Sequence, residues 1–207
     1  MTRMRPLIAV AALILATVAA FFLWRAGDAT NVRGAVGEAG SSQGTGTPTI
    51  GGDFTLTDQD GRRVTQADFQ GKYMLIYFGF TFCPDVCPTE LQVMSAALQA
   101  LGTDAEKVQP ILITIDPERD TPDVLATYVK QFDPRLIGLT GSADEIAAVA
   151  KAYRVYYEKV KDDESSADYT MDHSSVVYLM GPDGKFLAFF PPATDPEAMA
   201  EKIKGLM

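Results

Sequence analysis

The feature that most constrains the fold is an uninterrupted run of apolar and aromatic residues, Tyr73–Phe80. A strand covered on one face alternates apolar with polar residues, whereas a strand buried on both faces is apolar throughout. The run therefore predicts a central strand in a sheet that is covered on both sides. A second run of this kind, Ile111–Ile115, predicts another buried strand in the same domain.

The remaining segments alternate between helix and strand patterns. Thr121 before Pro122 has the form of an N-cap followed by a first helical residue, and Ser142 with Glu145 has the form of a capping box. The other expected elements are a hairpin beginning at Asp53, a helix containing Leu91–Leu101, a hairpin of Ser175–Met180 with Lys185–Phe190, and a last helix from Asp195. This order predicts a three-layer α/β domain with a mixed sheet.

The N-terminus carries a membrane signal. Residues 7–24 form an uncharged run, with Arg3 and Arg5 before it and Arg25 after it. A spanning helix needs about 20 apolar residues, and the range reaches down to about 17; a signal peptide has a shorter apolar region and a small-residue cleavage site. We expect one uncleaved transmembrane helix at 7–24 and a cytoplasmic-side N-terminus at 1–6. Because positive residues stay inside, the following domain is expected in the bacterial periplasm or the mitochondrial intermembrane space.

Composition divides the rest of the chain. Residues 25–52 are rich in Gly, Ser, Thr and Ala without hydrophobic periodicity, which predicts a flexible linker. The globular domain is then expected at 53–207. Beyond residue 24 the chain has 16 basic and 27 acidic residues, a net charge of −11. This charge disfavours a nucleic-acid partner, and the sequence has no Gly-rich phosphate-binding loop.

The whole chain contains only two cysteines and one histidine. Cys83 and Cys87 form a Cys-x-x-x-Cys pair at the junction between the first buried strand and the helix after it. Three uses fit the pair. A structural disulfide is one, although it would close a very short loop. A redox dithiol is another, because a helix N-terminus stabilises a thiolate. The third is a metal site, because side chains four residues apart can face the same way on a helical turn.

His173 lies just before the strand predicted from Ser175 to Met180, in a strand-edge loop that can arrive beside the cysteines. Two thiolates and one imidazole suit copper. Zinc is disfavoured because a structural zinc site has four ligands, although an Asp or a water could complete one. Asp116, at the end of the second strand, and Asp172, beside His173, are candidates for supporting the site without being ligands. Asp116 also fits a simple turn role before Pro117.

Four stretches of the sequence carry a more specific pattern. The first is Tyr77-Phe-Gly-Phe-Thr-Phe-Cys-Pro-Asp-Val-Cys-Pro-Thr-Glu-Leu91, and the second is Ile115-Asp-Pro-Glu-Arg-Asp-Thr-Pro122. The third is Asp168-Tyr-Thr-Met-Asp-His-Ser-Ser175, and the fourth is Tyr178-Leu-Met-Gly-Pro-Asp-Gly-Lys185. Together they span nearly the whole expected domain. The combination resembles the Sco/SenC family of copper chaperones for cytochrome c oxidase assembly.

The resemblance implies a thioredoxin-like fold on a single membrane anchor. It further implies one copper ion per chain, Cu(I) or Cu(II), bound by Cys83, Cys87 and His173. The implied recipient is the CuA site of cytochrome c oxidase subunit II, and a periplasmic copper donor chaperone would be a second partner. The expected membrane is the bacterial inner membrane, or the mitochondrial inner membrane with the domain facing the intermembrane space.

The competing hypothesis is an enzyme, a thiol:disulfide oxidoreductase that uses Cys83 and Cys87 to keep the CuA-site cysteines reduced. The two hypotheses differ at His173, because thiol exchange needs no imidazole ligand whereas copper retention does. A thioredoxin-like peroxidase is a weaker alternative, since it requires neither the second cysteine nor a dedicated histidine. We therefore expect a metallochaperone first and thiol–disulfide reductase activity second.

Overall fold

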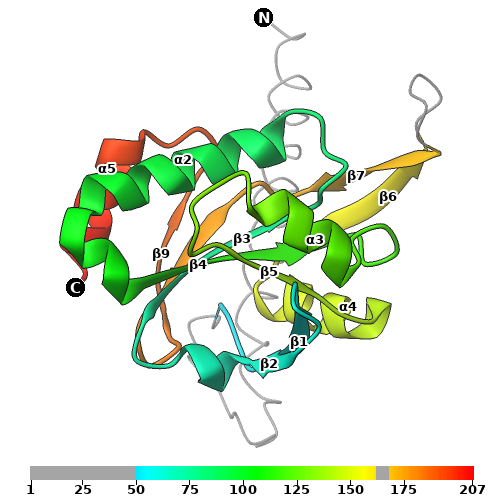
Figure 1. The fold of residues 1–207 in the computed structure, drawn as a ribbon, viewed down its shortest axis with the longest axis horizontal. Coiled ribbons are helices and arrows are strands. Elements are labelled where there is room, and N and C mark those ends of the chain that lie inside the picture. The colour runs from blue at the N-terminus through cyan, green and yellow to red at the C-terminus, as the bar shows by residue number, and fades with distance from the viewer. Residues whose placement is uncertain (1–49, 162–167) are drawn as a thin grey trace, which may run out of the picture. The chain divides into compact units, whose positions relative to one another are not determined.

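The computed structural model describes residues 50–161 and 168–207 (Figure 1). Within these two ranges, no helix is long and apolar enough to cross a bilayer. The expected membrane span at 7–24, the segment 1–6 and most of the expected linker at 25–52 lie outside the described residues, so these expectations stay predictions.

A seven-stranded mixed sheet forms the centre of the domain, in the order β2-β1-β5-β4-β3-β8-β9. The central strand β3 pairs in parallel with β4 and antiparallel with β8, and all its residues after Tyr73 are buried. The prediction of a strand covered on both faces is thus confirmed. The strands are β1 (Thr55–Asp58), β2 (Arg63–Thr65), β3 (Tyr73–Gly79), β4 (Val108–Thr114), β5 (Ile137–Thr140), β8 (Val177–Met180) and β9 (Phe186–Phe190).

The helices begin where the capping signals predict them. At the start of α3, the hydroxyl oxygen of Thr121 accepts a hydrogen bond from the backbone N–H of Val124. At the start of α4, Ser142 and Glu145 form a complete capping box. The helices are α2 (Val86–Leu101), α3 (Pro122–Val129), α4 (Ala143–Ala152) and α5 (Pro196–Lys204), with short 3-10 helices at Gln66–Phe69 and Gly102–Lys107.

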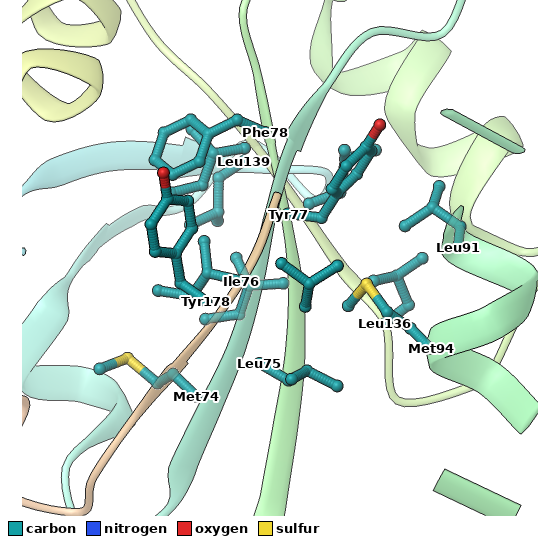
Figure 2. Packing of buried hydrophobic residues seen from close by; sticks show 14 of the residues in the cluster. Met74, Leu75, Ile76, Tyr77, Phe78, Leu91, Met94, Leu136, Leu139 and Tyr178 are labelled. Atoms are coloured by element: carbon teal, nitrogen blue, oxygen red, sulfur yellow. The ribbon is translucent and has the colours of Figure 1, made fainter. Parts of the chain in front are cut away.

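Helices cover both faces of the sheet. Strands β3, β4 and β5 are parallel neighbours, so right-handed connections place α2 and α3 on the same face, where α5 packs against α2. On the other face the ring of Tyr153, just after α4, lies 5.4 Å from that of Phe78. Figure 2 shows Tyr77 directed toward Leu91 of α2 and Phe78 directed the other way, toward Tyr178. The predicted three-layer α/β architecture is confirmed.

Two strands outside the main sheet correct the prediction for His173. Strands β6 (Tyr157–Lys161) and β7 (Tyr169–His173) form a separate antiparallel pair in which His173 faces Tyr157. His173 is therefore the last residue of a strand and not part of a loop, and β8 begins only at Val177. The sequence did not indicate this pair because only Met171 of its ten residues is buried, so the two strands carry no apolar periodicity.

We expect the Ser142→Ala substitution to lower the free energy of unfolding by about 1 kcal/mol, because it removes the side-chain acceptor of the α4 capping box. Urea denaturation measures the change. Thr127→Ala is the matched control, since it removes an exposed hydroxyl that bonds back to the carbonyl of Asp123 inside α3 and leaves a better helix former. Equal losses in the two variants would contradict the assigned role of the cap.

Candidate functional site

Cys83 and Cys87 lie where β3 passes into α2, as predicted. Cys83 is half-buried in the loop before the helix, whereas Cys87, the second residue of α2, is fully buried. The backbone N–H of Cys87 donates to the sulfur of Cys83 over 3.4 Å. The first N–H groups of a helix have no partner within the helix, so the Cys83 sulfur occupies the place of a capping acceptor.

The structure brings His173 to the same point from strand β7. Its Nε2 lies 3.5 Å from the sulfur of Cys87, and the rings of Tyr77 and Phe80 meet the imidazole edge-on. Its Nδ1 lies 3.2 Å from the carbonyl oxygen of Ser174. Because a carbonyl only accepts hydrogen bonds, Nδ1 carries the proton and the Nε2 lone pair faces the thiol.

The two thiols differ in acidity. The hydrogen bond from Cys87 lowers the pKa of Cys83 to about 4, against the opposing effect of burial. The hydrogen bond to Cys83, together with burial, raises the pKa of Cys87. At neutral pH the pair is therefore a half-exposed thiolate beside a buried thiol, and Cys83 is the nucleophile of the two.

Gly79, the last residue of β3, makes this approach possible. A Cβ atom at this position would lie 2.7 Å from a ring carbon of Tyr77 and 3.1 Å from the sulfur of Cys87. Only glycine therefore lets the first turn of α2 pack so closely on the end of β3. Sequence reasoning missed this residue, because the requirement arises from tertiary packing and no local turn signals it.

The two predicted supporting carboxylates occupy different environments. Asp116 is buried, accepts a hydrogen bond from the hydroxyl of Tyr169 over 2.9 Å and pairs with Arg119. Asp172 is exposed and pairs across the ladder with Glu158, on the opposite side of β7 from His173 because side chains alternate along a strand. Asp116 thus reaches the His173 strand through Tyr169, and a supporting role for either carboxylate stays a prediction.

The geometry suits a metal ion at two of the three predicted ligands. Metal–ligand bonds of about 2.0–2.3 Å place two ligands of one ion roughly 3.5–4 Å apart, which matches the spacing of Cys87 and His173. Within residues 50–161 and 168–207, no three His, Cys, Asp or Glu side chains form a ready-made metal site. The third predicted ligand, Cys83, is hydrogen-bonded to Cys87, and binding of one ion by all three side chains stays a prediction.

Fold and site together define a class of protein, a thioredoxin-like α/β domain with a Cys-x-x-x-Cys pair at the start of a helix and a histidine on a neighbouring strand. The sequence matches the SCO1/SenC family over residues 42–207, and the chain belongs to this family. It is 50% identical over 147 residues to the mitochondrial Protein SCO1 homolog of Homo sapiens. This match covers 70% of the chain and 48% of the human protein, so the chain spans about half the length of that relative.

Two solved structures are informative neighbours. Bradyrhizobium japonicum ScoI with copper bound is 49% identical, with a TM-score of 0.70 over 76% of this chain and 99% of that one. BsSco, described as a member of the Sco family of cytochrome c oxidase assembly proteins with a disulfide switch, is 28% identical, with a TM-score of 0.60 over 77% of this chain and 94% of its own.

Iodoacetamide is expected to alkylate Cys83 well before Cys87, because Cys83 is both the more exposed and the more acidic thiol. Its rate should stay nearly flat from about pH 8 to about pH 5, whereas an ordinary thiol of pKa about 8.5 slows roughly tenfold per pH unit. Mass spectrometry of quenched, digested samples measures both sites. In Cys87→Ala the stabilising hydrogen bond is lost and the Cys83 profile should move to higher pH. A wild-type Cys83 profile centred near that of a free thiol would contradict the assignment.

Proposed function

We propose that this protein is a membrane-anchored metallochaperone that carries one copper ion, Cu(I) or Cu(II), on Cys83, Cys87 and His173. The observation that carries the proposal is the contact between the Nε2 lone pair of His173 and the sulfur of Cys87, beside the Cys83 thiolate. Two thiolates and one imidazole form a soft donor set of the kind that favours copper over Mg²⁺ or Ca²⁺. Copper bound to Bradyrhizobium japonicum ScoI supports the choice of metal.

The recipient we propose is the CuA site of cytochrome c oxidase subunit II, with a periplasmic copper donor chaperone as the source of the ion. BsSco, described as a member of the Sco family of cytochrome c oxidase assembly proteins, supports cytochrome c oxidase as the target. The unequal burial of the thiols suits a cargo site: Cys87 is fixed in the core, and Cys83 is open to an incoming ligand. As each bond from the recipient to copper forms, one bond from this site breaks.

The domain plan fits the same role. A cytoplasmic-side segment at 1–6, an anchor at 7–24 and a linker at 25–52 would hold the copper domain at 53–207 near a target in the same membrane, where tethering raises its effective concentration. We propose the bacterial inner membrane with the domain in the periplasm, or the equivalent mitochondrial inner membrane. The mitochondrial relatives support this location.

A thiol:disulfide oxidoreductase is the second candidate, and the unequal acidity of the two thiols favours it. The Cys83 thiolate would attack a disulfide of the target, forming a mixed disulfide and releasing one target thiolate. Cys87, losing its proton, would then attack the Cys83 sulfur and release the second. The target gains two electrons, the Cys83–Cys87 disulfide forms, and an external dithiol has to reduce it again.

The copper proposal predicts one tightly held copper ion per chain in the reduced, detergent-solubilised protein. Cys83→Ser and Cys87→Ser should abolish stable loading, because each removes one of only two thiolates, and His173→Ala should weaken retention, most strongly for Cu(II). Metal analysis after anaerobic gel filtration and the Cu(II) spectrum measure these effects. Lys185→Ala, which changes an exposed residue in the turn between β8 and β9 and none of the three ligands, should load as the wild type does.

The same variants separate the two candidate functions. Reduction of a disulfide-containing target peptide should survive in His173→Ala and fail in both serine variants, because exchange uses only the sulfurs. A wild-type protein that retains no copper but exchanges disulfides readily would overturn the chaperone proposal. A His173→Ala variant with wild-type Cu(II) spectra would remove His173 from the ligand set.

A further inference from the structure

The strand that carries His173 is not part of the main sheet. Among residues 50–161 and 168–207, strands β6 and β7 pair with each other and with no strand of the main sheet, so no ladder joins β7 directly to β3. Backbone hydrogen bonds hold a strand in register within its own sheet. The chain that leads from His173 into β8 joins β7 to the main sheet at one end, and a further link comes from side chains outside the strand pair.

Arg119, on the turn between β4 and α3, provides that link. Its Nη1 donates to the backbone carbonyl of Tyr169 over 3.0 Å, and its guanidinium carbon lies 3.9 Å from the centre of the Tyr169 ring. The same guanidinium lies 4.8 Å from the centre of the Phe82 ring. Tyr169 begins the strand that ends in His173, and Phe82 directly precedes Cys83. One side chain therefore touches both the histidine strand and the cysteine loop.

The same turn is itself anchored on both sides. The carboxylate of Asp116 accepts one hydrogen bond from Arg119 and another from the hydroxyl of Tyr169, so it holds the guanidinium against the Tyr169 ring. Asp120, which is fully buried, accepts the backbone N–H of Thr81 over 3.0 Å and its hydroxyl over 2.5 Å. Because Thr81 lies two residues before Cys83, the turn holds the cysteine loop through Asp120 and the histidine strand through Arg119.

We propose that Arg119 is a positioning residue, which holds β7 against the cysteine loop so that His173 meets Cys87. A planar guanidinium can donate from its edge while its face stacks on aromatic rings, and the ammonium group of lysine cannot do both. Groups that orient ligands in this way typically change metal affinity by about 10–100-fold when they are lost. The copper part of this inference rests on the proposed function, but the positioning does not.

A measurement without copper tests the positioning directly. The chain has one histidine, so the imidazole NMR signals belong to His173 alone. The wild type should show nuclear Overhauser contacts from this ring to Tyr77 and Phe80, whose ring centres lie 6.2 and 5.9 Å away. Arg119→Lys should weaken these contacts and broaden the imidazole signals while circular dichroism stays unchanged. Unaltered contacts would overturn the inference and leave the proposed function standing.

Two further variants make the test specific. Arg135→Lys is the matched control, because Arg135 also pairs with a nearby aspartate, Asp133, but precedes the start of β5, at the opposite end of the parallel strands. It should leave the His173 signals as in the wild type. Tyr169→Leu removes the ring on which Arg119 stacks, so it should weaken the His173 contacts and broaden the imidazole signals as Arg119→Lys does. If Arg119→Lys fails to fold, this variant tests the positioning role in its place. A Tyr169→Leu variant with wild-type His173 contacts would overturn the inference.

A double-mutant cycle tests the copper part. Arg119→Lys should weaken copper retention by about tenfold or more in the wild-type background, and by less than about twofold when His173→Ala is already present, because it acts through that histidine. Equal losses in both backgrounds would show a general structural effect and overturn the positioning role. A wild-type protein that binds no copper would count against the proposed function alone, since the NMR comparison stands independently.

Discussion

The burial of β3 on both faces is the constraint on which the rest of the structure depends. Apart from its first residue, every side chain of β3 is inside the domain, so α2 has to cover one face and the aromatic cluster around Tyr153 the other. A strand held from both sides cannot slide without exposing its apolar side chains. Its carboxyl end at Gly79 is therefore a fixed point, and the cysteine loop begins there.

The sheet topology explains why the other parts of the site meet at this edge. Strands β3 and β4 are parallel, so the turn that carries Asp116 and Arg119 emerges beside the cysteine loop. Strand β8 runs antiparallel to β3, with Val177 opposite Tyr77, so the residues just before β8 arrive at the same edge. In α/β sheets functional groups commonly gather at the carboxyl ends of the parallel strands. Because β8 is antiparallel to β3, the residues between His173 and Val177 lie at this same edge of the sheet.

The features that could be predicted from sequence are those with local signals. Two buried strands, the capped helices and the position of Cys83 and Cys87 between strand and helix follow from apolar runs and cap residues. The pair β6–β7 does not, because its exposed Glu, Lys and Asp side chains show no periodicity. Gly79 and Arg119 were likewise missed, since one serves the approach of α2 and the other the docking of β7. Both are contacts between distant segments that no local pattern records.

The three proposed ligands come from elements of different rigidity, and this difference fits a site that has to release what it binds. Cys87 is set in a helix packed on the core, so moving it would disturb the packing of β3. Cys83 belongs to a loop, and His173 to a strand pair tied to the turn after β4 by side chains alone. Neither residue belongs to a strand of the main sheet, so a change in its position would leave the hydrogen-bond ladders of that sheet in place. This arrangement is compatible with the proposal that the metal is carried as cargo and passed on.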